Sequence, residues 1–330
     1  MPDTLTQDGV GTAMRIVKYG ELKPCLNAFI DTRTPGSDKK ENFTIIGPGV
    51  SENPDQFVHI AEPHGFNIGG ARQPPGCTNS QHSHTTVEVF YVHSGHWRFD
   101  LGEHGDDAQI ALSPGDLISI PTNVFRGFTN IGKGSGFLWA VLGGDDPGHV
   151  LWAPKVFDMA KNYGLVLLED GSLVDVGCGE TIPAGKSPMP VTSLDQVDAL
   201  QTFTGAQLET CVARSGERGP RGLFDDLGGV KDVLLVGDGR MNWQHGFRVS
   251  EASILPGAAI PAHHLDVPDV WFVQEGKAVV RQNDASTIIG EGDTITIQPG
   301  AQRALQNAGE TPVKLVMVRG GDAPTLLHWS

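Results

Sequence analysis

The sequence lacks a surplus of basic residues, and this absence bears on its partners. It contains 24 Lys and Arg against 39 Asp and Glu, which gives a formal net charge of -15 at pH 7. A strongly negative chain without a basic stripe is a poor match for a phosphate backbone. We therefore expect no nucleic-acid partner.

Cysteine pairs and long apolar runs are also missing. The four cysteines form no CxxC pair and no disulfide-type framework, which favours a reducing compartment. No apolar run approaches the roughly 18 residues needed to cross a bilayer, and the N-terminus shows no secretory pattern. These absences predict a cytoplasmic protein with no membrane partner.

Glycine and proline are plentiful, with 43 and 22 residues. Together with few charged residues, they are typical of a turn-rich all-β protein. Alternating apolar and branched residues, broken by Gly, Pro and Asn turns, occupy residues 57–142 and again 233–318. Each block predicts a β-barrel. Between the blocks, residues 155–163 and 193–203 predict two short helices, the second capped by Ser193.

These patterns divide the chain into three parts. We assign residues 1–150 to an N-terminal barrel with its core at about 57–142, residues 151–206 to a helical connector, and residues 207–330 to a C-terminal barrel. A chain of 330 residues also has the length of two units with separate cores.

An internal repeat relates the two barrels. The first contains a spaced series of glycines and metal-ligand side chains: Gly76, His82, His84, Glu88 and Gly95. The series recurs 181 residues later with two changes: Gly257, His263, Leu265, Asp269 and Gly276. A second series at 115–130 recurs 177 residues later, and it contains Arg126 in the first block and Arg303 in the second.

The two series resemble the two-part signature of the cupin superfamily, G-x5-H-x-H-x3-E-x6-G followed by G-x5-P-x-G-x2-H-x3-N. The first block matches the first half without exception. In its second half, Asn123 replaces the turn glycine and Arg126 the last histidine; in the C-terminal block, Gln298 replaces the proline and Arg303 the histidine. The resemblance implies an all-β bicupin, with two double-stranded β-helix (jelly-roll) barrels, similar in layout to bacterial ring-cleaving dioxygenases.

His82, His84 and Glu88 are candidate metal ligands on their chemistry alone. Because strand side chains alternate, their even spacing places them on one face if the segment stays extended or turns between residues 84 and 88. Two imidazoles and one carboxylate suit Fe(II), and also Mn, Ni, Co or Zn. The alternative is a pair of solvated histidines in a polar loop. The matching glycine spacing favours the ligands, so we predict one divalent metal per chain, with Fe(II) preferred.

Arg126 cannot replace a histidine ligand, because a guanidinium has only hydrogen-bond donors. At about 5 Å from a divalent ion and an effective dielectric near 20, it would be repelled by roughly 6–7 kcal/mol before compensation. We predict that Arg126 either binds a substrate carboxylate or enolate beside the metal, or pairs with an acidic side chain away from the metal; a wall arginine facing solvent is the alternative. Glu88 is a candidate catalytic base by family analogy. Phe90, Trp97 and Phe99 are candidate substrate contacts, with core packing as their other role.

The second barrel keeps only a degenerate site, His263, Asp269 and Arg303. One imidazole and one carboxylate bind metals poorly. The adjacent His264 should face the opposite side of its strand. We predict that this barrel is non-catalytic and serves as scaffold, or as a subunit contact through residues 270–273. The resemblance also implies a homodimer or higher homo-oligomer.

The leading functional hypothesis is a metal-dependent enzyme that acts on a small, anionic or enolisable organic molecule, with dioxygenase chemistry first. A cupin lyase, isomerase or decarboxylase would use the same ions as Lewis acids and leave the same motif. A non-catalytic bicupin that binds a small molecule is the alternative from another class.

Overall fold

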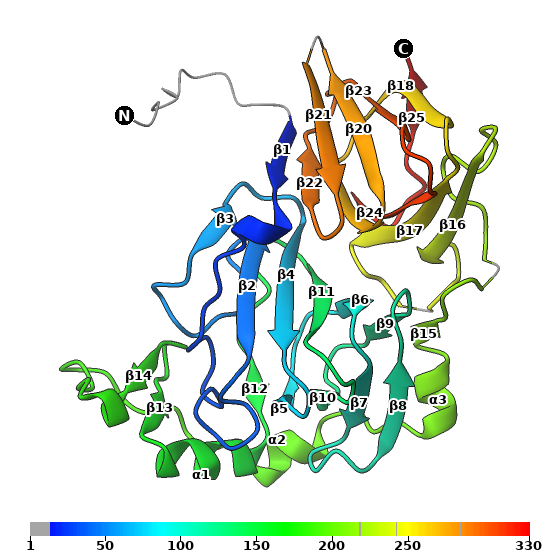
Figure 1. Ribbon diagram of the computed structural model, residues 1–330. Coiled ribbons are helices and arrows are strands. Elements are labelled where there is room, and N and C mark those ends of the chain that lie inside the picture. Colours follow the sequence, from blue (N-terminus) through cyan, green and yellow to red (C-terminus); the bar gives the residue numbers. More distant parts are fainter. Residues whose placement is uncertain (1–13, 218, 242, 284) are drawn as a thin grey trace, which may run out of the picture.

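Two β-barrels, one above the other in Figure 1, make up most of the computed structural model, which describes residues 14–217, 219–241, 243–283 and 285–330. Two sheets form the N-terminal barrel. The strands of the first are, in spatial order, β15 (Val212–Ala213), β9 (Leu117–Ile120), β6 (Glu88–Ser94), β11 (Gly136–Gly143), β4 (Phe66–Gln73), β2 (Glu41–Ile46) and β3 (Val58–Ile60). Those of the second are β12 (Leu151–Trp152), β5 (Thr78–Ser83), β10 (Arg126–Asn130), β7 (Trp97–Leu101) and β8 (Ala108–Leu112).

The C-terminal barrel repeats this arrangement. Its first sheet contains, in spatial order, β1 (Met14–Val17), β22 (Thr294–Ile297), β19 (Asp269–Glu275), β24 (Val313–Gly320), β17 (Phe247–Ile254) and β16 (Val230–Val236). Its second contains β21 (Ala285–Gly290), β20 (Lys277–Gln282), β23 (Arg303–Gln306), β18 (Ala259–Leu265) and β25 (Leu327–Trp329). The expectation of an all-β protein with two barrels is confirmed.

Short elements fill the connector beneath and beside the N-terminal barrel (Figure 1). They are α1 (Pro154–Asn162), β13 (Leu165–Leu167), β14 (Leu173–Asp175), η2 (Val176–Cys178), α2 (Leu194–Asp198) and α3 (Gly205–Glu209); η1 (Tyr19–Glu21) follows β1. Ser193 caps α2 as predicted, by accepting from the backbone N–H of Gln196. The prediction of a single helix over 193–203 is wrong. The backbone N–H of Gln201 donates to the carbonyl of Asn123 in the barrel, and Thr204 caps the separate helix α3.

The two barrels exchange their leading strands. β1, which precedes the N-terminal barrel in sequence, pairs with β22 of the C-terminal barrel. In return, β15 pairs with β9 of the N-terminal barrel. One sheet of each barrel is therefore extended by a strand from outside its own repeat, and Figure 1 shows β1 close to β22.

Equivalent residues of the two repeats meet at the barrel interface. His93 and Gln274, which are 181 positions apart, contact each other: the imidazole Nδ1 donates to the amide oxygen, 2.9 Å away, and the amide nitrogen donates to the His93 carbonyl. Trp139 stacks on Phe272 with ring centroids 5.0 Å apart. Residues 270–273 are fully buried by this interface and by the C-terminal barrel core. The subunit contact predicted for them is wrong, since a repeat of the same chain covers the strand.

One hydrogen bond across this interface gives a test of barrel docking. The hydroxyl of Tyr91 donates to the Glu251 carboxylate, 2.7 Å away, and burial raises the pKa of Glu251 while this bond lowers it. Tyr91→Phe removes the hydroxyl donor, so the half-buried Glu251 carboxylate loses this hydrogen bond. We expect the free energy of unfolding to fall by about 1–3 kcal/mol in urea denaturation. A variant as stable as the wild type would mean that the bond contributes nothing to docking.

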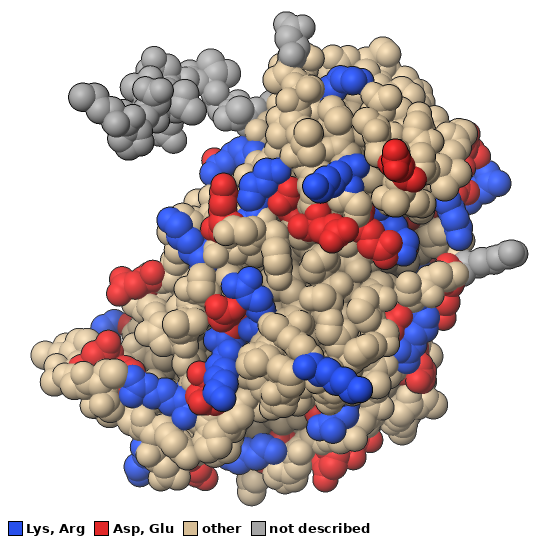
Figure 2. All heavy atoms as spheres, viewed as in Figure 1, with Lys and Arg blue, Asp and Glu red and all other residues tan. Residues whose placement is uncertain are grey.

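Acidic and basic side chains are interspersed on the face shown in Figure 2, and no continuous basic surface is visible in that view. Among the residues that the structure describes, no helix combines the length and apolar character needed to cross a bilayer.

Candidate metal centre

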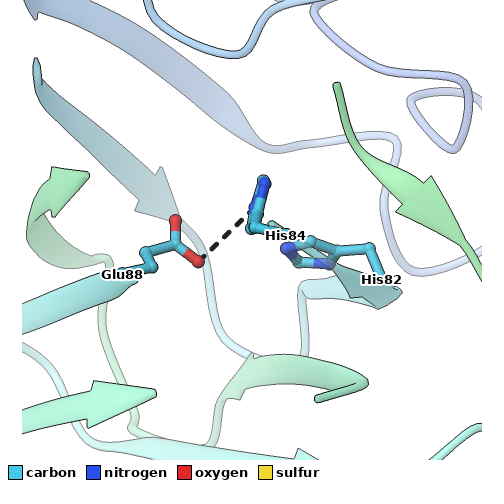
Figure 3. Close-up of side chains that lie close together, drawn as sticks. All are labelled: His82, His84 and Glu88. Carbon is cyan, nitrogen blue, oxygen red and sulfur yellow. Dashed lines mark ion pairs between the residues drawn. The ribbon is translucent and has the colours of Figure 1, made fainter. Parts of the chain in front are cut away.

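The three candidate ligands converge inside the N-terminal barrel. His82 lies on β5, His84 follows that strand, and Glu88 opens β6 in the facing sheet. The chain therefore turns between residues 84 and 88, one of the two arrangements that would bring the side chains together. One ligand atom from each residue lies within 4.8 Å of the others, and all three residues are buried (Figure 3).

Both imidazoles are in the state that a metal requires. Nδ1 of His82 donates to the carbonyl oxygen of Ser80, 2.7 Å away, which fixes the tautomer and leaves Nε2 with its lone pair. Burial, followed by the charge of Arg126, lowers the pKa of His82 to about 3 and that of His84 well below its usual value. Neutral rings therefore face Glu88, and Nε2 of His84 lies 3.6 Å from its carboxylate.

Arg126 is fully buried beside Glu88, which rules out the solvent-facing alternative. Its Nε lies 3.4 Å from Oε2 of Glu88, and Nη1 donates to the carbonyl of Val124. Burial raises the pKa of Glu88 to about 7, although Arg126 opposes the shift. Among the residues that the structure describes, Oε2 of Glu88, Nδ1 of His84, and Nε and Nη2 of Arg126 are buried without a hydrogen-bond partner. A single long ion pair thus leaves the carboxylate short of positive charge, and a bound cation would supply it.

A small cavity of about 70 Å³ lies next to the three ligands. The ligands and Phe90 form part of its wall; the polar part consists of Asn42, Thr44, Ser51, Gln56, Asn67 and Asn79. At roughly 10–15 Å³ for each water-sized group, the space holds about five such groups. Only a compact molecule fits without movement of the wall.

Comparison with known proteins agrees with this geometry. The family described as "Cupin domain" matches residues 71–141 and again residues 250–319. The chain is a two-domain cupin. Each matched segment contains the ligand positions of one barrel, so the internal repeat is a repeat of cupin domains.

Solved structures share the whole bicupin architecture. Oxalate decarboxylase from Lactobacillus farciminis, in a formate complex, has a TM-score of 0.60 at 12% identity and covers 97% of this chain and 89% of that chain. Oxalate decarboxylase from Bacillus subtilis at pH 4.6 has a TM-score of 0.58 at 14% identity, over 96% and 78% of the two chains. At these identities the likeness concerns the fold.

Curated relatives match over short segments. Acireductone dioxygenase from Bacillus subtilis is 44% identical over 50 residues, which are 15% of this chain and 28% of that protein. Mannose-1-phosphate guanylyltransferase from Salmonella typhimurium is 32% identical over 76 residues, or 23% and 16% of the two chains. The bicupin spans less than a third of either relative's length.

The second cupin domain holds its carboxylate in ion pairs. Asp269 lies 2.6 Å from Nη2 of Arg303 and 3.4 Å from Nε of Arg319, and it accepts from the indole of Trp271. Burial opposes ionisation, yet Arg319 and Arg303 hold the pKa of Asp269 below its usual range. With Leu265 in place of the second histidine, a cation at His263 would face two buried arginines. The geometry supports the prediction of a degenerate site.

Asn123 takes the place of the family's turn glycine without disturbing the turn. Its φ of 57° lies in the left-handed region, as does that of Gly300, its equivalent in the second domain, at 75°. Asparagine tolerates this conformation better than other non-glycine residues. The departure from the signature therefore leaves the backbone in place, and it is Arg126 that changes the chemistry.

The three aromatic candidates lie at different depths. Phe90 reaches the cavity wall together with Phe128. Trp97 and Phe99 do not line that cavity: they pack with Phe90 and Phe128 in the barrel core, and the Trp97 indole donates to the carbonyl of Ser94. Alternation along a strand indicates which residues face inward but not which layer of the interior they fill. The geometry favours core packing for these two.

Sequence reasoning missed a tryptophan beside His82 and a glutamate that is hydrogen-bonded to that tryptophan. The ring of Trp152 lies 5.3 Å from that of His82, centroid to centroid, and its indole donates to Glu52, 2.5 Å away. Glu52 also accepts from the backbone N–H of Ile30. The repeat could have indicated Trp152, because Trp329 stands 177 residues later and pairs with His263 as Trp152 pairs with His82. No motif marked Glu52.

Glu52 should make stability depend on pH. Burial raises its pKa to about 8 from 4.5, although the Trp152 and Ile30 hydrogen bonds oppose the shift. Between these values the folded state binds more protons than the unfolded state, so the contribution of Glu52 to the free energy of unfolding falls as pH rises, by up to about 1.4 kcal/mol per unit.

Glu52→Gln removes this titration. It also leaves an N–H of Trp152 or Ile30 without an acceptor, a loss of about 1–3 kcal/mol at every pH. The stability advantage of the wild type over the variant should therefore shrink steadily from about pH 5 to about pH 7.5 in urea denaturation. Parallel curves would show that Glu52 does not titrate in this range.

Proposed function

We propose that this bicupin is a metal-dependent enzyme whose N-terminal domain binds one divalent ion, with Fe(II) preferred, through His82, His84 and Glu88. The observation that carries the proposal is the contrast between the two domains. The Glu88 carboxylate is buried with one long ion pair beside two neutral imidazoles, whereas Asp269 is held by two arginines. Of the two equivalent interior sites, the one in the N-terminal barrel therefore suits a cation better.

The substrate we propose is a small anionic or enolisable organic molecule. The 70 Å³ cavity limits its size, and the amides and hydroxyls of the wall offer hydrogen bonds to its oxygens. Nη2 of Arg126 is buried without a partner, and an anionic oxygen bound beside Glu88 would satisfy it. Arg126 would thus orient substrate charge beside Glu88, the candidate base.

Dioxygenase chemistry is the reaction class we favour. Two histidines and one carboxylate leave open positions on an ion, and bound Fe(II) would activate dioxygen and substrate together. The local likeness to acireductone dioxygenases supports this choice, since those proteins are named for that chemistry. A decarboxylase is the second candidate, supported by the architecture shared with oxalate decarboxylases.

Purification without oxygen, followed by metal analysis and oxygen-uptake assays, tests the proposal. We expect close to one more ion per chain in the wild type than in His84→Ala, and dioxygen consumption with a small enediol, diketone, catechol or gentisate-like acid. Release of carbon dioxide from a small dicarboxylate without oxygen uptake would replace the dioxygenase by a decarboxylase. A bound ion without turnover of any candidate would indicate a small-molecule-binding role, and protein without metal would overturn the proposal.

A further inference from the structure

The outer face of the second cupin domain carries a cluster of metal-ligating side chains that the proposed reaction does not use. His264 lies on β18 next to the inward-facing His263, and it faces the opposite side of the sheet, as strand alternation requires. Directly across from it in the register is His328 of β25. Asp266, which follows β18, completes the cluster.

The three side chains are already arranged around one point. The imidazole rings of His264 and His328 are stacked, with centroids 4.7 Å apart and an angle of 11° between their planes. Nε2 of His328 lies 3.0 Å from Oδ2 of Asp266. One ligand atom from each of the three residues lies within 4.8 Å of the others. Side chains that are 43% and 61% exposed, His328 and Asp266, have the freedom to close on an ion.

The donor set limits the class of ion. Two imidazole nitrogens and one carboxylate oxygen suit zinc and the divalent first-row transition metals, whereas calcium and magnesium prefer oxygen donors alone. Because the cluster is on the surface, water can complete the coordination.

The cluster lies between two neighbouring strands, which an ion bound there would link. β25 is at the edge of its sheet, where it pairs with β18. On the other face of β25, the ring of the half-exposed Trp329 lies 5.9 Å from that of His263 and 6.4 Å from that of Phe224. An ion shared by β18 and β25 would hold this strand, and with it Trp329, against the barrel.

We propose that His264, Asp266 and His328 form a second divalent-metal site, of the zinc class, that fastens edge strand β25 to β18. The site is independent of the centre at His82, His84 and Glu88. It stabilises the domain whose inner site is degenerate.

Zinc titration of the chelator-stripped full-length chain tests the site. We expect the wild type to bind one more zinc ion than His328→Asn or His264→Asn, measured by calorimetry and by metal analysis after dialysis. The same difference should persist in a His84→Ala background, which separates the two sites. His104→Asn is the matched control: His104 is also exposed and lies 3.9 Å from Glu103, but that pair belongs to no cluster of three ligands within the described part of the chain.

Amide hydrogen exchange measures how strongly a bound ion stabilises β25 against local opening. Zinc at ten times its dissociation constant should slow exchange of the β25 amides roughly tenfold in the wild type, and not in His328→Asn. Circular dichroism shows whether the variants are folded. Equal zinc stoichiometry in the wild type and His328→Asn, or β25 exchange that zinc leaves unchanged, would overturn the proposal.

Discussion

Arg126→Met is expected to tighten divalent-metal binding by the N-terminal domain about a hundredfold. The guanidinium lies 3.4 Å from Glu88, so it competes with an ion for the same carboxylate. The repulsion between such a cation and a divalent ion is several kcal/mol at an effective dielectric near 20, and relief of about 2.7 kcal/mol corresponds to a hundredfold. The same variant should lose affinity for small carboxylates, because the unpartnered Nη2 is gone. Competition with a fluorescent chelator measures the first effect, and carboxylate-induced shifts of the metal spectrum measure the second.

Arg303→Met is the matched control in the second domain. It removes the equivalent arginine, so metal affinity should not change. Asp269 keeps only Arg319 as an ion-pair partner, and we expect the free energy of unfolding to fall by about 3–5 kcal/mol. If Arg126→Met weakens metal binding instead, the arginine is needed to hold Glu88 in place, and our account of its charge is wrong.

His84→Ala should lower metal affinity by more than about a hundredfold. Loss of a residue that only hydrogen-bonds a ligand already lowers affinity by up to about a hundredfold, and loss of the ligand itself should cost more. The remaining imidazole and carboxylate make the first site chemically like the second, which has Leu265 at this position. Metal analysis after dialysis should find one ion fewer per chain in His84→Ala than in the wild type, and no loss in His263→Ala, the corresponding change in the other domain. Equal metal content in His84→Ala and the wild type would show that His84 is not a ligand.

Much of the fold follows from the repeat in the sequence. Two sets of spaced glycines, each at a turn, mark where strands begin and end, and a constant offset shows that the two halves share one topology. The even spacing of His82, His84 and Glu88 likewise predicts their convergence, because alternation along a strand is a local property of the backbone. Local chemistry was sufficient for these features.

Features that depend on distant segments could not be predicted in this way. The exchange of β1 and β15 between barrels is set by which sheet edge each short strand meets, and two or four residues carry too little pattern to specify it. Glu52 reaches Trp152 from a loop 100 positions away. The strand at 270–273 is apolar on both faces. This pattern indicates that the strand is buried, but it does not indicate which segment covers it. Its partner is the other half of the same chain.

Anomalous diffraction from crystals grown with Mn(II) or Co(II) would test the central claim most directly, since it locates an ion and does not merely count it. The account predicts a strong peak between His82, His84 and Glu88, at about 2.0–2.3 Å from the ligand atoms, and no peak between His263 and Asp269. No peak at the first position, or a comparable peak at the second, would contradict it.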